Sequence, residues 1–183
     1  VDFDKAYRLQ EVEQAVRSVD GVIQVEGWQF ASGELLDDNG HIVENLTLLA
    51  PPAESTLVQP ILVAGRWMRP DDVRKMAVSE GLLKTYPNLK AGDSITMRIN
   101  GRDEKWEVVG LFKFVDQEGL LGYAPFEYIS DMNNLANRSF SFRVVTAQHD
   151  RAYQDAKAEE LDKNLRGRGY KVRVAQAGGA SLD

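Results

Sequence analysis

Two histidines are the residues of this chain best suited to acid–base chemistry, and neither has the companions that catalysis requires. His41 follows an Asp-Asp-Asn-Gly turn sequence, and His149 precedes a segment of helical composition. A histidine base acts on an activated nucleophile, but the Gly-x-Ser-x-Gly and Ser-x-x-Lys patterns of serine nucleophiles do not occur in the sequence. We therefore interpret both histidines as solvated surface residues and predict no catalytic residue.

The sequence also lacks the residues of a metal site and of a phosphate-binding loop. The sequence contains no cysteine, which removes thiolate nucleophiles, disulfides and thiolate metal sites together. Residues 37–40 are acidic but lack the alternating ligands and distal glutamate of an EF-hand, so a turn explains them better. No Gly-x-x-x-x-Gly-Lys-Ser/Thr loop occurs, so ATP, if used, is hydrolysed on another domain or chain. The sequence predicts no metal site and no cofactor.

Composition narrows the class of protein. The chain has 183 residues, of which 43% are hydrophobic and 27% charged, enough for one medium domain or two small ones with a shared core. The net charge is −6 and no Lys/Arg-rich run occurs, which argues against a nucleic-acid partner. No segment reaches the roughly 20 apolar residues of a membrane helix. Because the chain begins with Val1 and lacks cysteine, we expect an extracytoplasmic piece of a longer protein.

The first third of the chain predicts a helix followed by a β-hairpin. Apolar residues recur at helical spacing over residues 4–18, which indicates an amphipathic helix. Residues 22–31 and 42–49 have β patterns, with a bulge expected at Gly27. Asn39-Gly40 between them is the strongest short-range signal of a hairpin, because both turn residues must adopt positive φ.

The middle third predicts short strands and tight turns. Strands are expected at residues 75–79, 94–99 and 105–114, with a short helix beginning near Ser79. Asn100-Gly101 predicts a second hairpin. This spacing is typical of a small, strongly bent sheet or partial barrel.

The last third predicts a strand, a helix and a strand, at residues 138–146, 149–166 and 170–174, which together form a βαβ unit. The fold class is therefore α+β, with a mixed α/β subdomain split in sequence around an inserted β-rich subdomain. We expect the split subdomain at residues 1–55 and 136–183, and the insert at residues 56–135.

Four motifs in the middle third carry a resemblance to a known family. They are Pro-Ile-Leu-Val-Ala-Gly-Arg-Trp at residues 60–67, Met-Ala-Val-Ser-Glu-Gly-Leu-Leu at 76–83, Leu-Lys-Ala-Gly-Asp-Ser-Ile-Thr-Met at 89–97 and Trp-Glu-Val-Val-Gly-Leu-Phe at 106–112. In this order and spacing they resemble the periplasmic core domain of MacB-like, FtsX-type ABC transporter permeases. The resemblance covers roughly residues 60–126, and the flanks match in the order of their elements.

The resemblance implies a non-catalytic domain on the extracytoplasmic side of a cell membrane, between the first two transmembrane helices of a permease. Its split α/β part would be the porter part of that family. Such permeases work as dimers with a cytoplasmic ABC ATPase and expel peptides, drugs or lipoproteins, in some cases with a periplasmic adaptor. The start of the first helix near Asp4 and the end of the last strand near Val174 should then lie within roughly 25 Å of one another. The alternatives are a secreted or periplasmic binding module and a hydrolase of unrecognised type.

One loop is the sequence's candidate for partner contact. Leu120 and Leu121 lie between two glycines, with no period that would bury them. Exposed adjacent apolar residues on a loop often mark a binding surface. We therefore predict partner contacts at Phe114, Leu120, Leu121 and Tyr123. The competing interpretation is a loop that folds back on its own subdomain.

Overall fold

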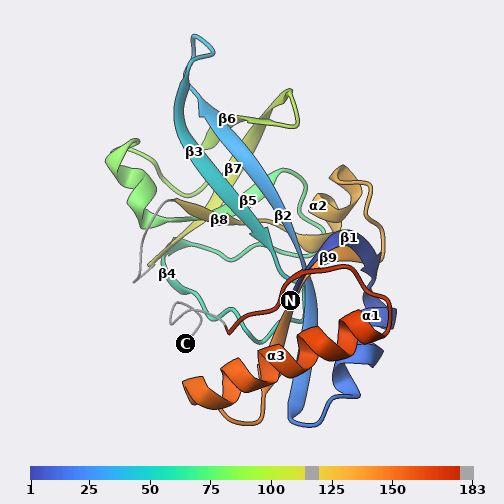
Figure 1. The fold of residues 1–183 in the computed structure, drawn as a ribbon. Helices are drawn as coiled ribbons and strands as arrows, with labels where there is room; N and C mark the ends of the chain where they lie inside the picture. Colours follow the sequence, from blue (N-terminus) through green and yellow to red (C-terminus); the bar gives the residue numbers. More distant parts are fainter. Residues whose placement is uncertain (114–119, 178–183) are drawn as a thin grey trace. The chain divides into compact units, whose positions relative to one another are not determined.

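A computed structural model of the chain describes residues 1–113 and 120–177 (Figure 1). The chain divides into two compact units. The α/β unit consists of Val1–Gln29 and the described residues from Asn133 onward, and the β unit is Phe30–Met132. Residues 30–55, which the sequence groups with the split subdomain, thus belong by their contacts to the same unit as the middle of the chain.

The α/β unit is a four-stranded antiparallel sheet with two helices. Its elements are β1 (Asp2–Arg8), α1 (Leu9–Arg17), the first part of β2 (Val22–Leu36), β9 (Arg138–Thr146), α3 (Arg151–Gly167) and β10 (Val172–Val174). The strand order is β10-β1-β9-β2. Strand β9 therefore lies between β1 and β2, and β1 lies between β9 and β10. This interleaving is the ferredoxin-like β-α-β-β-α-β arrangement, with the β unit placed in sequence between β2 and β9.

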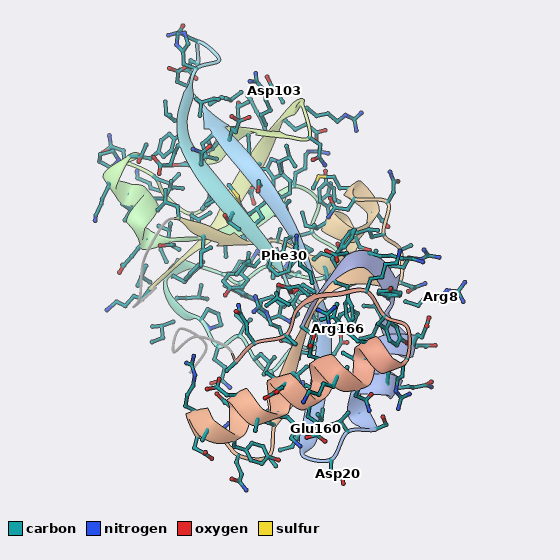
Figure 2. All side chains as sticks on the ribbon, in the orientation of Figure 1. Arg8, Asp20, Phe30, Asp103, Glu160 and Arg166 are labelled. Carbon is teal, nitrogen blue, oxygen red and sulfur yellow. The ribbon has the colours of Figure 1, made fainter. Side chains whose placement is uncertain are left out.

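The core of the α/β unit lies between its sheet and its helices. Both helices cover the same face, because residues of both pack in one cluster with residues of all four strands. The strands contribute Phe3, Val25, Phe142 and Val172, and the helices Val12, Val16, Leu161 and Leu165. At the end of α1, Lys157 donates hydrogen bonds to the Asp20 carbonyl and to Glu160, whose positions Figure 2 labels. Lys157 therefore ties α3 to the turn that follows α1.

The first element differs from the prediction. The helix expected at residues 4–18 begins only at Leu9, and residues 2–8 form β1 between β9 and β10. Phe3 is the only fully buried residue of the strand, and both its neighbours are acidic, so the sequence shows no β alternation there. The bulge expected at Gly27 is also misplaced: the register shifts between Val22 and Gln24. At Gly27 a Cβ would instead overlap Leu9, so this glycine permits close packing.

The β unit is built from strands that close into a ring. Its elements are the rest of β2, β3 (Ile42–Ala50), β4 (Ile61–Gly65), β5 (Lys75–Ser79), the 3₁₀ helix η1 (Glu80–Lys84), β6 (Ser94–Ile99), β7 (Arg102–Lys113), β8 (Leu121–Tyr123) and α2 (Phe126–Met132). The order β2-β3-β8-β5-β7 is closed by β6, which pairs with both β7 and β2. Strand β7 pairs with β5 along one edge, and along its other edge with β6 and then β4.

Both predicted hairpins are confirmed. Strands β2 and β3 form the long hairpin of Figure 1, with Gly40 at φ 80° in its turn. Asn100 at φ 52° and Gly101 at φ 76° join β6 to β7, as a type I′ turn requires. In the β unit, one buried cluster contains Val78, Leu82, Ile95, Trp106 and Val108. Among the described residues, no helix is long and apolar enough to cross a membrane.

Candidate functional site

The four residues predicted to contact a partner have different surroundings. Phe114 lies outside the described residues. Leu120 is half-buried against the core of the β unit, and Leu121 begins β8, where it is also half-buried. The expected exposure of this pair is not found, because β8 lies between β3 and β5 and pairs with both. The short apolar segment is a strand in the ring, as the competing interpretation of a loop folded back on its own subdomain supposed.

Tyr123 is buried in an aromatic cluster. Its ring centroid lies 5.2 Å from that of Trp67 and 5.5 Å from that of Phe112. Trp67 follows β4, and Phe112 lies in β7, so three segments of the β unit meet at these rings. Edge-to-face and tilted pairs of this kind each add about 0.5–1.5 kcal/mol beyond area burial. Tyr123 thus has a packing role, and partner contact at Leu120, Leu121 or Tyr123 stays a prediction.

Two glycines of the family-like motifs allow β4 and β7 to approach closely. Gly65 adopts φ 70°, and a Cβ on it would overlap the carbonyl oxygen of Val109. A Cβ on Gly110 would overlap the carbonyl oxygen of Arg66. The atoms in the way belong to the backbone and cannot move aside as a flexible side chain would. The Gly-Arg and Val-Val-Gly motifs are therefore the two sides of one backbone contact.

An ion pair fixes the loop after this contact. The Arg66 guanidinium donates to both carboxylate oxygens of Asp72, at 2.9 and 3.2 Å, and the Arg69 amide donates to the same carboxylate at 2.7 Å. Burial of Asp72 favours its neutral form, but the hydrogen bonds from Arg66 and Arg69 outweigh it and hold the pKa of Asp72 below its usual value. Asp72 is thus an anion with a structural role.

The Lys-Ala-Gly-Asp motif forms the turn into β6. Gly92 adopts φ 99°, and the Asp93 side chain accepts a hydrogen bond from the Lys90 amide at 2.9 Å. The Gly92 amide donates to the Val108 carbonyl at 2.7 Å, and the Val108 amide donates to the Asp93 carbonyl at 2.8 Å. The turn is therefore bound to the middle of β7. All these motif residues pack or turn the chain, and none presents a reactive group.

The strands that begin and end the described chain are neighbours. Asp2 of β1 is paired with Val174 of β10, and the Asp4 amide donates to the Lys171 carbonyl at 2.9 Å. Because the strands are antiparallel, the chain enters β1 and leaves β10 at the same end of the sheet, with paired Cα atoms about 5 Å apart. The expected separation of less than roughly 25 Å is confirmed. We call this β1–β10 pair the junction.

The second face of the α/β sheet carries a polar network that was not predicted from the sequence. The Glu26 carboxylate accepts hydrogen bonds from Gln24 Nε2 at 2.8 Å and from Trp28 Nε1 at 3.0 Å. The Arg143 guanidinium lies 5.0 Å from the centroid of a Trp28 ring. Glu26 and Trp28 are both buried, so these groups stabilise one another out of water. Alternating polar residues in a strand normally face solvent, which hides such a network from sequence analysis.

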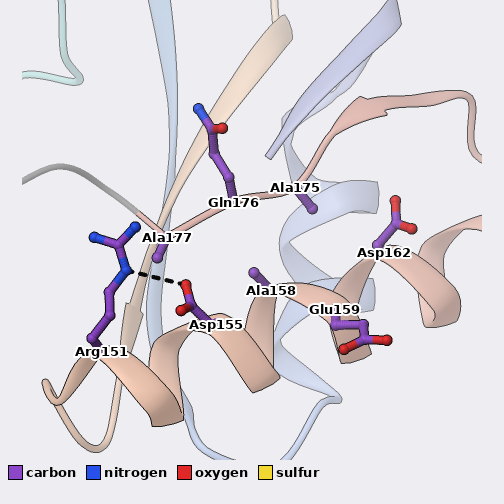
Figure 3. Close-up of a pocket in the computed structure, with 8 residues that line it drawn as sticks. All are labelled: Arg151, Asp155, Ala158, Glu159, Asp162, Ala175, Gln176 and Ala177. Carbon is purple, nitrogen blue, oxygen red and sulfur yellow. Dashed lines mark hydrogen bonds and ion pairs between the residues drawn. The ribbon is translucent and has the colours of Figure 1, made fainter.

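A shallow groove of about 330 Å³ runs along α3, where the chain leaves β10 (Figure 3). Its floor is formed by small residues, Ala158, Ala175 and Ala177. The acidic side chains Asp155, Glu159 and Asp162 lie along its helical side, and Asp155 is paired with Arg151 at 3.2 Å. Among the described residues, no group of His, Asp and Glu side chains is arranged to hold a metal ion. His41 lies at an exposed turn, 3.6 Å from Asp37.

Comparison with known proteins rests on structure, since neither a family model nor a curated sequence matches this chain. The extracellular domain of the noncanonic ABC-type transporter YknZ from Gram-positive bacteria matches with a TM-score of 0.57 and 19% identity, over 95% of this chain and 90% of that one. The periplasmic region of MacB from Actinobacillus actinomycetemcomitans also matches with a TM-score of 0.57, at 17% identity, over 92% of this chain and 78% of that one.

The chain has the fold of these two extracytoplasmic regions. The resemblance inferred from four motifs is thereby confirmed at the level of fold. Both matches extend over more than nine-tenths of this chain, so they include the α/β unit, where the sequence carried hardly any matching residue.

Proposed function

We propose that this chain is the extracytoplasmic domain of an export-type ABC transporter permease. In this role it couples ATP hydrolysis in the cytoplasm to motion outside the membrane and recruits a partner or substrate. The single observation that carries the proposal, beyond the fold, is the junction. A domain inserted between two membrane helices must be connected to both of them on the same side. The chain enters β1 and leaves β10 at neighbouring positions, as this requires.

The α/β unit has the construction that a mechanical coupler needs. A displacement applied at β1 and β10 enters a sheet in which β1 pairs with both β10 and β9. The helices α1 and α3 pack across these strands through Phe3, Phe142 and Leu161, which makes the unit resist bending. In the proposed assignment this unit is the porter-like part, and the β unit is the insert.

The proposed partners follow from the same role. A cytoplasmic ABC ATPase, on the same polypeptide or a separate subunit, supplies the energy, and the permease acts as a dimer. A periplasmic adaptor, or a lipoprotein or peptide substrate, would be recruited outside the membrane. The domain itself is expected to hydrolyse neither ATP nor ester or peptide substrates, because the sequence lacks a phosphate loop and a nucleophile–base pair.

Labelling of single cysteines in intact cells tests the location. The chain contains no cysteine, so Asn39→Cys in the exposed β2–β3 turn adds its only thiol. In the protein encoded by the complete gene, any cysteine outside this chain is first replaced by serine. We expect a membrane-impermeant maleimide to label this thiol from outside, and the protein to remain in the membrane fraction. Leu35→Cys, a buried position on the same hairpin, is the matched control and should stay unlabelled until the protein is denatured.

Coupling is tested by a crosslink across the junction. Asp2→Cys with Val174→Cys places two thiols on paired residues, within the Cα separation that a disulfide bridges. If both strands move as one body, the oxidised transporter in vesicles should retain ATP-driven export. Loss of export on oxidation, restored by reduction, would show that the junction must open and would refute this mechanism. A secreted binding module would instead appear in the medium or periplasm, free of any membrane segment.

A further inference from the structure

Strand β4 is an exposed, uncharged edge. It is the last strand in the order of the β unit and, within the described residues, pairs only with β7. All five of its residues are exposed, with Ile61 at 63%, Leu62 at 38% and Val63 at 43%. The register shifts between Leu62 and Ala64, which interrupts the alternation and leaves all three large side chains in solvent. An edge strand presents unpaired N–H and C=O groups that another strand can complete.

This edge lacks the charge with which exposed edges are usually protected. Natural edge strands carry charged residues, above all lysine, that oppose pairing with another chain. The sequence Ile-Leu-Val-Ala-Gly contains no charge, in a chain of which 27% of residues are charged. With a net charge of −6, two copies of this chain repel one another over most of their surfaces. At β4 two copies can meet without bringing like charges together.

We propose that β4 pairs antiparallel with β4 of a second copy of this chain, about a two-fold axis through Val63. In that register Ile61 lies opposite Gly65 of the second copy and Leu62 opposite its Ala64. Large residues thus face small ones on both sides of the axis, and Val63 faces its own counterpart. The strand is therefore complementary to itself in size and charge, which is what an isologous contact between identical subunits requires.

The size of this contact makes it weak unless the two copies are held together. Five residues per strand bury far less than the roughly 1,200 Å² of a stable interface. Two copies tethered in one permease dimer would experience millimolar effective concentrations, at which a weak contact is populated. This step rests on the proposed function and names the surface through which the extracytoplasmic domains of the dimer touch.

Disulfide trapping with this chain in solution tests the pairing. In the proposed register, the Val63 Cα atoms of two copies lie about 4.5–5.5 Å apart, within the range that a disulfide spans. At high protein concentration and under mild oxidation, Val63→Cys should form a disulfide dimer at least about tenfold faster than Ile23→Cys. Ile23, in the α/β unit, is the matched control, because its 63% exposure shows it to be at least as accessible.

A second substitution separates pairing from random collision. Leu62→Lys in the Val63→Cys background should slow the dimer to the rate of the control, and Ile23→Lys in that background should not. Equal rates of disulfide dimer formation for Val63→Cys and Ile23→Cys would overturn the proposal. The irregularity of β4 would then serve to prevent pairing with another chain. Faster trapping at Ile61→Cys than at Val63→Cys would overturn the register. If trapping succeeds while Asn39→Cys is not labelled from outside the cell, the proposed function fails and the β4 pairing stands.

Discussion

The two units of this chain make very different demands on their sequences. In the α/β unit, the core between the sheet and the helices requires apolar residues such as Phe3, Val16 and Leu161 on one face. In the β unit, the backbone of β4 and β7 approaches so closely that Gly65 and Gly110 admit no side chain. Asp72 must also be an anion that accepts from both Arg66 and the Arg69 amide. The core of the α/β unit requires a hydrophobic pattern, whereas the β4–β7 contact and the loop after it require particular residues.

This difference explains why all four family-like motifs lie within the β unit. A hydrophobic pattern is satisfied by many sequences of similar volume, so residues in such a core can change while the fold persists. A glycine at a backbone contact or positive φ has no substitute. A family resemblance is therefore detected in the unit whose backbone geometry allows the fewest residue types. The predictions that follow test whether the two units differ in this way.

The largest effect is expected in the core of the β unit. Trp106 is 2% exposed and lies with its ring centroid 5.4 Å from that of Tyr128. Trp106→Ala should lower the free energy of unfolding by roughly 3–5 kcal/mol, measured by denaturant unfolding followed by circular dichroism. Val73→Ala, at an exposed position, is the control and should have little effect. An unchanged unfolding midpoint for Trp106→Ala would contradict the burial described.

The distinction between pattern and residue is tested most directly with glycines. Gly110→Ala should cost about 3 kcal/mol, because the added Cβ meets the Arg66 carbonyl oxygen, which belongs to the backbone. Gly167→Ala, at the end of α3, meets nothing within 4 Å and should be neutral or gain up to about 1 kcal/mol of helix propensity. Thermal unfolding of both variants measures the difference. Similar losses for both would remove the contrast between the units.

Asp72 adds a pH dependence to the β unit. Because the pKa of Asp72 is lower in the folded chain than in the unfolded one, its ionised form stabilises the fold at neutral pH. This contribution is complete above about pH 4 and is lost as the pH falls through the lowered pKa. Asp72→Asn should therefore cost about 1–3 kcal/mol at pH 7 and progressively less below pH 4. Asp71→Asn, at the exposed neighbouring residue, is the matched control and should cost less than Asp72→Asn at pH 7.

The smallest effect is expected in the α/β unit, at the start of α3. The Asp150 side chain accepts from the Tyr153 amide at 3.0 Å and caps the helix. Asp150→Ala should cost about 1 kcal/mol, and Asp150→Ser should restore most of it, because serine also caps. Hydrogen exchange of the first amides of α3 and thermal unfolding measure the effect. A loss as large as that of Trp106→Ala would show that this unit too depends on single residues.

The predictability of individual elements follows the same division. The hairpins at Asn39-Gly40 and Asn100-Gly101 could be predicted, because positive φ restricts the residues that form such turns. Strand β1 could not, since its only deeply buried residue is Phe3 and its pairing partners lie more than a hundred residues away in sequence. The helix α3 was recognised from local composition, with its start at Arg151 and not at residue 149.

The candidate site was less predictable than the fold. Leu120 and Leu121 have no periodic neighbours that would indicate burial, yet β8 pairs with strands on both of its sides. Conversely, Ile61, Leu62 and Val63 have the composition of a buried strand and are exposed. In both cases the position of a strand within the sheet, at its centre or at its edge, decides exposure. Local sequence does not encode that position.

The junction has a mechanical consequence that depends on the direction of load. If the chain is pulled apart at Asp2 and Val174, the hydrogen bonds between β1 and β10 break one after another, as in a zipper, each contributing only about 0.5–1.5 kcal/mol. If both points are instead pushed in the same direction, parallel to the strands, the force acts in shear on the hydrogen bonds that join β1 to β9 and β9 to β2. The α/β unit should thus resist a force that moves Asp2 and Val174 in the same direction. A much smaller force should suffice to pull these two residues apart.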